Sequence, residues 1–354
     1  MYSESDLTAA VAAGAISAEA AQALRDHVAA GQHAPAVDEE HFRLLTGFND
    51  IFVSIAAVIL LVAMAWIGQA IATPMAGVLV AASAWGLAEF FTRQRRMALP
   101  SIILLLAFVG GVAAAQIGLL VDHGEAWFGT NPDKQLTSVI GAGVALITTG
   151  AAFLHWRRFM VPITVAAGTA AAVATIIGLI IAAIGPDNVE STVILSLVLV
   201  GGIGVFAFAM NWDRSDRSRT TRRSDVAFWL HLLAAPMIAH PLFSLLGVND
   251  SGTISVGGAI GVLGLYLLFG VIALAVDRRA LLVTALAYVL FALTQLFREF
   301  GAVELNIALT ALVIGSALLL LSAFWQNARS LVIGVLPQAV RDLVPVPGTV
   351  AQSA

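Results

Sequence analysis

The stretch "FWLHLLAAPMIAHPLF", residues 228–243, is a nearly continuous apolar run that holds two histidines and two prolines. Extended to 225–247, it is long enough as an α-helix to cross about 30 Å of membrane hydrocarbon at about 1.5 Å per residue. Ionisable groups are costly at that depth, and a proline removes a backbone hydrogen bond from its helix. The stretch therefore predicts a membrane-spanning helix, and it raises the question of what His231 and His240 do there.

The composition of the whole chain is that of a membrane protein. Of its 354 residues, 59% are hydrophobic and 11% are charged, whereas soluble domains are about half apolar and a quarter charged. The chain has no cysteine, which excludes disulfides, thiolate metal sites and cysteine nucleophiles. The motifs of zinc proteases, phosphate-binding loops and serine hydrolases are also missing from the sequence. The sequence thus predicts a protein that is not an enzyme and that holds no cofactor and no metal.

The apolar runs divide the chain into three parts. Residues 1–47 form a polar, cytoplasmic leader, read as two short helices on either side of Gly14. Residues 48–326 form a polytopic transmembrane domain, and residues 327–354 form a cytoplasmic tail. Apolar residues at 336, 340, 343 and 344 follow one side of the tail, which is typical of a segment that lies along the membrane interface.

The predicted fold class is all-α integral membrane, because each apolar run after the leader is about the length of one membrane crossing. About ten transmembrane helices are predicted, at 49–71, 74–92, 99–121, 136–155, 159–184, 191–211, 225–247, 253–276, 280–297 and 303–325.

Arginine is concentrated in every second connection between these helices. The connections after the second, fourth, sixth and eighth helices carry twelve arginines, namely Arg93, Arg95, Arg96, Arg157, Arg158, Arg214, Arg217, Arg219, Arg222, Arg223, Arg278 and Arg279. The alternate connections carry several acidic residues and only two basic ones, Lys134 and Arg298. By the positive-inside rule, the arginine-bearing end and both termini are expected in the cytoplasm.

The four arginine-bearing connections also suggest an internal repeat. Each contains an arginine pair, and the second arginines of the pairs lie 62, 65 and 56 residues apart. This period favours a repeated helical hairpin. Short cytoplasmic turns in an arginine-biased chain would converge on the same pair, so both interpretations stay open.

The leader pattern "AGAISAEAAQAL" and the first apolar helix, "FNDIFVSIAAVILLV", together resemble an uncharacterised family of bacterial multi-pass membrane proteins. Members of that family pair a short cytoplasmic helical leader with a long hydrophobic domain. The resemblance implies a bacterial inner-membrane protein and supplies no catalytic motif. Ten helices with both ends inside are also similar to the drug/metabolite transporter superfamily, in helix number alone.

Polar side chains within the predicted helices form a candidate pathway. At matching depths they suggest an outer layer of Gln69, Gln116, Gln295 and His240, and an inner cluster of Glu89, His155, His231 and Asp225. Pro236 and Pro241 release two backbone carbonyls, so a discontinuous helix lining a hydrated cavity is expected between them. Alternatively, the amides hold neighbouring helices together, and the outermost charged groups extend to the interface.

Two functions from different classes fit this pattern. The first is a transporter or channel-like permease for a small solute or ion, with the two histidines in the pathway. The second is a non-catalytic membrane scaffold or assembly factor that recruits partners through its leader and tail. The expected partners are the lipid bilayer, a small solute or ion, and a second copy or another membrane protein; no nucleic acid is expected.

The arginine asymmetry predicts the sidedness of the loops. Because the chain has no native cysteine, single cysteines at Ser218 and Asn131 can be labelled with a membrane-impermeant maleimide. We expect the cysteine at 131 to react in intact cells and the cysteine at 218 to react only after the membrane is opened. Labelling of both from the same side would contradict the ten-helix arrangement.

Overall fold

The computed structural model describes residues 4–24, 48–217, 219, 221–246, 256–299, 306–341 and 343–345, and this part of the chain contains helices and no strand. The chain divides into two compact units, Met1–His41 with Val346–Ala354, and Phe42–Pro345. The first unit contains α1 (Glu4–Ala12) and a second helical stretch at 18–24, joined through Gly14, whose φ is 69°. The two short helices predicted for the leader are therefore present.

The second unit consists of long helices joined by short connections. They are α3 (Phe48–Ile71), α4 (Thr73–Ala88) continued by the π-helix η1 (Glu89–Gln94), α5 (Ala98–Phe128), α6 (Lys134–Phe159), α7 (Ile163–Ile184), the 3-10 turn η2 (Pro186–Asn188), α8 (Ser191–Ser215), α9 (Arg222–Leu245), α10 (Val256–Val276), α11 (Ala280–Glu299), α12 (Asn306–Ala323), α13 (Trp325–Val335) and α14 (Gln338–Arg341). Every range predicted as a span holds one of these helices, and the all-helical fold class is confirmed.

The number of membrane-length helices is lower than the predicted ten. Among the described residues, eight helices are long and apolar enough to cross a membrane, and a ninth is counted if α12 and α13, bent by 77° at Phe324, form one span. The apolar part of α11, Leu281–Thr294, is shorter.

The outward faces of the helices are apolar. Large hydrophobic side chains are exposed along the unit, among them Trp66 (78% exposed), Val200 (68%), Leu267 (71%) and Leu319 (73%). A water-soluble protein seldom leaves so much contiguous apolar surface uncovered. These faces have the chemistry of surfaces that contact lipid chains.

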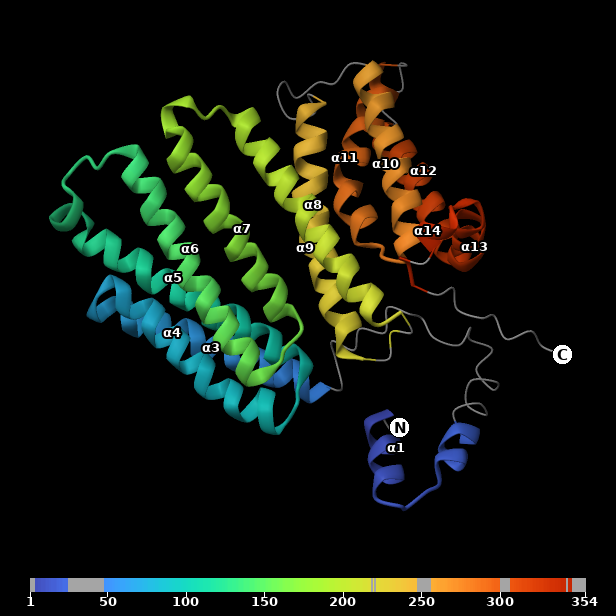
Figure 1. Ribbon diagram of the computed structural model, residues 1–354, viewed down its shortest axis with the longest axis horizontal. Coiled ribbons are helices and arrows are strands. Elements are labelled where there is room, and N and C mark those ends of the chain that lie inside the picture. The colour runs from blue at the N-terminus through green and yellow to red at the C-terminus, as the bar shows by residue number, and fades with distance from the viewer. Residues whose placement is uncertain are drawn as a thin grey trace. The chain divides into compact units, whose positions relative to one another are not determined.

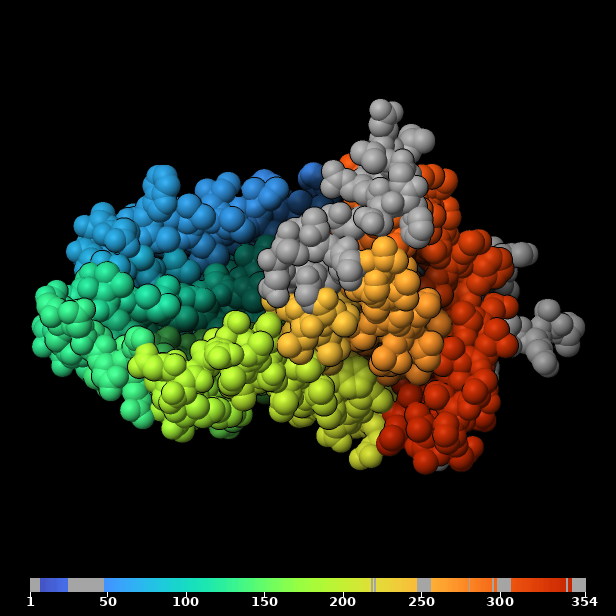
Figure 2. Space-filling model, turned by 90° about the horizontal axis from the view of Figure 1, so that it is seen from above, coloured from blue at the N-terminus to red at the C-terminus, as the bar shows by residue number. Residues whose placement is uncertain are grey.

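The helices pair as antiparallel hairpins that lie side by side in chain order (Figures 1 and 2). Besides α3, which packs on α4, the closely packed pairs are α4 with α5, α6 with α7, α8 with α9 and α10 with α11. Each of these pairs is joined by one of the four arginine-bearing connections, so all four arginine turns lie at the same end of the helices, the lower end in Figure 1. We call this end the arginine end.

The four arginine turns share one backbone feature. Each arginine turn contains one non-glycine residue in the left-handed region, namely Arg96 (φ 53°), Met160 (54°), Arg219 (53°) and Asp277 (59°). An L-residue in this conformation costs about 1–2 kcal/mol. The residue stands at a different distance from the arginine pair in each turn, and the α8–α9 turn is longer than the other three, so the repeated hairpin and chance convergence both stay open.

Helix α9, which contains the stretch 228–243, is the most buried of the membrane-length helices. Half of its apolar window is buried, because α7, α8 and α11 pack around it. The expected break between Pro236 and Pro241 is wrong: α9 is a continuous α-helix with both prolines inside it.

Close packing on α8 accounts for this continuity. A Cβ added at Gly202 would come within 2.8 Å of Met237 Cβ and 2.9 Å of the Met237 backbone carbonyl carbon. The α9 backbone is thus held directly against α8 one residue after Pro236. This contact supports α9 from one side next to the proline, while Pro236 itself is exposed.

This contact can be tested with two neighbouring glycines of α8. Gly202→Ala should lower the free energy of unfolding by about 1–3 kcal/mol, because the new methyl group has no space and the two helices must separate. Gly204→Ala is the matched control, since nothing lies within 4 Å of its added Cβ, and the same helix propensity gain applies to both. Thermal unfolding in detergent measures the difference; equal melting temperatures would contradict the packing.

Candidate functional site

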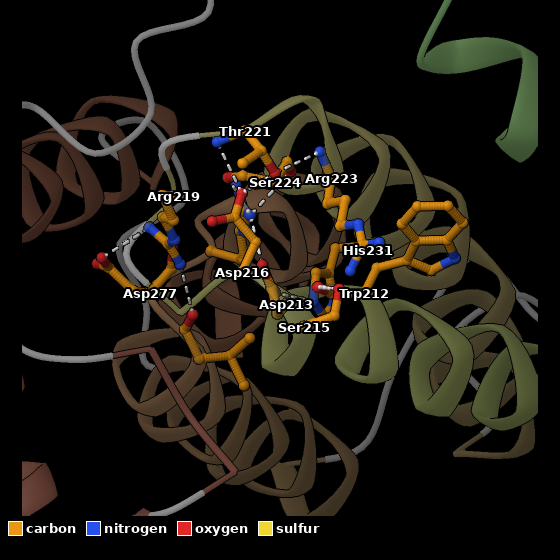
Figure 3. A network of polar contacts seen from close by, with 12 residues as sticks. Trp212, Asp213, Ser215, Asp216, Arg219, Thr221, Arg223, Ser224, His231 and Asp277 are labelled. Atoms are coloured by element: carbon orange, nitrogen blue, oxygen red, sulfur yellow. Dashed lines mark hydrogen bonds and ion pairs between the residues drawn. The ribbon is translucent and has the colours of Figure 1, made fainter. Parts of the chain in front are cut away.

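The most concentrated polar chemistry of the second unit lies at the arginine end, where α8, α9 and the α10–α11 turn meet (Figure 3). At its centre is the Asp213 carboxylate in the last turns of α8, which is 1% exposed. His231 Nε2 of α9 lies 2.8 Å from Asp213 Oδ2, and Arg278 Nη2 donates to Asp213 Oδ1 over 2.7 Å. Both oxygens of the buried carboxylate therefore have a protein partner, each from a different part of the chain.

Arg278 connects this centre to the start of α9. Its Nη2 also donates to the backbone oxygen of Ser224 over 3.1 Å and to Ser224 Oγ over 3.3 Å, and its guanidinium lies 5.9 Å from the Phe228 ring centre. Arg278 Nε has no acceptor among the described residues. One buried arginine thus holds three elements, α8, α9 and the α10–α11 turn, in a fixed arrangement.

A second buried carboxylate, Asp277, follows directly after α10. Its left-handed φ of 59° ends the helix, and the next backbone N–H, that of Arg278, bonds back to the Ala273 oxygen over 2.9 Å, the hydrogen bond of a Schellman cap. Asp277 Oδ2 accepts from Arg219 Nη1 over 3.0 Å, and Asp277 Oδ1 accepts from Trp325 Nε1 over 2.6 Å.

Residues of α13 and of the tail also contact this group of side chains. Arg329 of α13 is fully buried, with Nε 3.6 Å from Asp277 Oδ1, and its Nη2 donates to the Pro345 oxygen over 2.9 Å. Arg217 donates to the backbone oxygens of Arg341 and Val344. The tail residues Arg341, Val344 and Pro345 are therefore hydrogen-bonded to the α8–α9 turn or to α13, and the tail residues up to Pro345 belong to the second unit.

A local turn presents Arg219 to Asp277. Asp216 Oδ2 accepts from the Thr221 backbone N–H over 2.9 Å and from the Thr221 hydroxyl over 2.6 Å, while Thr221 Oγ1 caps α9 by accepting from the Arg223 N–H. The short side chains of aspartate and threonine favour such local bonds. We call Asp213, Arg219, His231, Asp277 and Arg278 the ionic network.

Of the predicted candidates, His231 alone belongs to the ionic network. His240 is exposed near the opposite end of α9, where its Nδ1 lies 2.6 Å from the Tyr288 hydroxyl of α11. Pro236 is exposed and Pro241 is buried within the continuous helix. The two imidazoles therefore have separate partners and separate surroundings.

The other inner candidates are likewise dispersed. Glu89 forms a two-point ion pair with Arg158, at 2.7 and 2.8 Å. His155 is buried among aromatic rings, and its Nδ1 lies 3.3 Å from Thr164 Oγ1. Asp225 is exposed in the first turn of α9. Within the described part of the chain, no hydrogen bond or ion pair joins any two of the four predicted inner residues.

The three predicted outer glutamines differ from one another. Gln116 donates to the Val112 oxygen over 3.1 Å and to Thr148 Oγ1 over 3.3 Å, which joins α5 to α6. Gln69 is exposed. The side chain of Gln295 lies outside the described residues. Gln116 thus has the helix-joining contact that the alternative interpretation of the amides expected.

Most of the ionic network was not predicted from the sequence, because its arginines also fit the role of sidedness markers. The available signal was the acid beside them: the sequence reads Asp-Arg at 213–214, 216–217 and 277–278. Acidic residues are not needed for positive-inside sorting, so aspartates in an arginine-rich turn point to internal ion pairs. Trp325 and Arg329 carried no comparable signal.

No protein-family model matches this chain, and neither a curated protein nor a solved structure is similar to it. Among the described residues there is also no group of three or more histidines, aspartates and glutamates placed to hold a metal ion. The resemblance to a bacterial family with a helical leader therefore stays a prediction.

We expect a conservative substitution in the ionic network to lower the stability of the protein strongly. Asp213→Asn keeps the shape of the side chain but leaves Arg278 buried without its counter-charge, which should lower the free energy of unfolding by about 3–5 kcal/mol. Asp187→Asn is the control, because the Lys134–Asp187 pair is exposed and solvent screens it. The melting temperature in detergent should fall strongly for the first variant only; a similar small shift in both would show that the buried pair is not structural.

Proposed function

We propose that this chain is a polytopic membrane protein of about ten spans that serves as a non-catalytic scaffold, with its arginine end, leader and tail in the cytoplasm. On this proposal the ionic network makes the arginine end a rigid platform, and the leader recruits a partner protein. The setting expected from the arginine asymmetry and the leader pattern is the inner membrane of a bacterium.

The proposal is supported mainly by the complete pairing and burial of the carboxylates in the ionic network. Both oxygens of Asp213 and of Asp277 are engaged by donors from the protein, and His231 is 2% exposed. A group that passes ions or protons along a pathway must exchange with water or cargo. Charges that are fully paired inside the protein instead favour a structural role, in which they fix the positions of helices and turns.

A second candidate function, a permease for a small solute or ion, is favoured by one feature. A carboxylate, an imidazole and a guanidinium in contact at the ends of membrane-length helices are the groups that proton- and ion-coupled transporters use. In that case the Asp213–Arg278 pair would be an inner gate that opens during transport.

Ion flux separates the two candidates. The full-length protein is reconstituted in liposomes that contain a pH-sensitive dye, and gradients of H⁺, Na⁺ and K⁺ are imposed in turn. A protonophore is present for Na⁺ and K⁺, so that compensating proton movement reports their flux. The scaffold proposal expects the same leak as in protein-free liposomes. A leak of any of these ions that Asp213→Asn abolishes or strongly increases would favour the permease instead.

Site-specific cross-linking tests the recruiting role of the leader directly. Leu24 is 44% exposed in the first unit, so a photo-cross-linking amino acid at this position should give one discrete protein adduct in cells. The same amino acid at Trp66, which is exposed on an apolar helix face, is the control and should react with lipid only. Equal, diffuse reaction at both positions would contradict recruitment through the leader.

A further inference from the structure

A cavity of about 480 Å³ opens at the arginine end between α6, α8 and α9. Trp156 and Met160 line it from the end of α6, Trp212 and Ser215 from the end of α8, and Arg222 and Arg223 from the start of α9. Figure 3 shows Trp212, Ser215 and Arg223 beside the ionic network. The volume is within the range of about 300–1,000 Å³ that is usual for small-ligand sites. We call this cavity the tryptophan–arginine pocket.

The two arginines of the pocket differ from those of the ionic network. Arg217, Arg219 and Arg278 each donate to carboxylates or backbone oxygens. By contrast, the guanidinium groups of Arg222 and Arg223 make no hydrogen bond or ion pair within the described part of the chain, and both residues are exposed. Among the described residues, no carboxylate lines the pocket. Two arginines at one cavity whose guanidinium groups have no hydrogen-bond acceptor in the described part of the chain therefore favour an anionic ligand.

The remaining lining is apolar with polar edges. Trp156 and Trp212 are half-buried, and neither indole N–H has an acceptor among the described residues, so each is a free donor beside an apolar ring. Met160 and Val226 add further apolar surface. Tryptophan with this combination is enriched where membrane hydrocarbon meets the headgroups. A fully hydrated inorganic anion would gain no favourable contact from this apolar lining.

We propose that the tryptophan–arginine pocket binds an anionic phospholipid. The phosphate lies between the guanidinium groups of Arg222 and Arg223, and the glycerol and first methylene groups lie against the two indole rings. The acyl chains remain in the bilayer, along the exposed apolar faces of the helices. This inference rests on the membrane insertion proposed above, and it does not depend on the scaffold role.

The pocket is connected to the ionic network through the first turn of α9. Arg222 and Arg223 begin the helix whose cap, Thr221, is bonded to Asp216, and Ser224 of the same turn is bonded to Arg278. A lipid phosphate on the two arginines would therefore hold the start of α9 from the outside while Arg278 holds it from the inside.

Lipid retention tests the proposal. The full-length protein in detergent is titrated with phosphatidylglycerol or with phosphatidylcholine, and bound lipid is counted by native mass spectrometry. We expect a preference for phosphatidylglycerol that falls about tenfold in the variant R222Q/R223Q, since each arginine near a headgroup contributes appreciably to anionic lipid binding. The control variant R95Q/R157Q removes two exposed arginines of the same end that do not line the pocket, and it should change binding by less than about twofold.

Three outcomes would overturn the proposal: equal loss of binding in both double variants, no preference for phosphatidylglycerol, or complete displacement of the lipid by inorganic phosphate, which would identify a soluble anion site.

A second measurement tests the lipid contact without changing the charge of the pocket. Brominated phosphatidylglycerol should quench the tryptophan fluorescence of the native chain more than that of W156F/W212F, and equal fractional quenching would contradict lipid contact at the pocket. Extraction of cell membranes with alkaline carbonate separates failure of membrane insertion from failure of the lipid site.

Discussion

An ionised side chain that is buried inside a protein must have its counter-charge beside it, and this constraint organises the arginine end. Asp213 lies on an otherwise apolar helix and is almost fully buried. Its carboxylate is tolerable there because His231 and Arg278 reach it from two other elements. Losing Arg278 would leave the buried Asp213 charge without its counter-charge, at a cost of several kcal/mol. Losing His231 would leave one carboxylate oxygen without its hydrogen-bond partner. The relative positions of α8, α9 and the α10–α11 turn follow from this requirement.

The same constraint explains the strained turn between α10 and α11. Asp277 adopts a left-handed conformation that glycine would adopt without cost. Glycine, however, could not accept from Arg219 and Trp325. The turn thus combines a helix stop with a buried charge. Arg329 of α13 lies beside the same carboxylate, and it also donates a hydrogen bond to the Pro345 backbone oxygen.

The sequence was informative about periodic and local features. Length and apolarity predicted the helices, the alternation of arginine predicted the common end of four turns, and Gly14 marked the leader turn. It was misleading about Pro236 and Pro241, because their effect depends on how closely Gly202 of a neighbouring helix approaches. The Asp213–Arg278 pair joins residues 65 positions apart, and such partners cannot be assigned without knowing which helices are neighbours. His231 could be singled out as costly, but its partner could not.

The central claim is that the ionic network stays closed to water in the membrane-embedded protein. Two serines close to the network allow this claim to be tested. Ser224 is buried and accepts a hydrogen bond from Arg278, whereas Ser215 is exposed. Each is replaced by cysteine in the cysteine-free chain, and modification by a charged methanethiosulfonate is followed over time in liposomes of phosphatidylcholine, which lack the anionic lipid proposed to bind beside Ser215. The account predicts that the cysteine at 215 reacts at least about a hundredfold faster, because position 224 is reached only through local opening of the network. Similar rates at both positions would mean that the network opens readily to water, and would contradict the closed, structural role assigned to it.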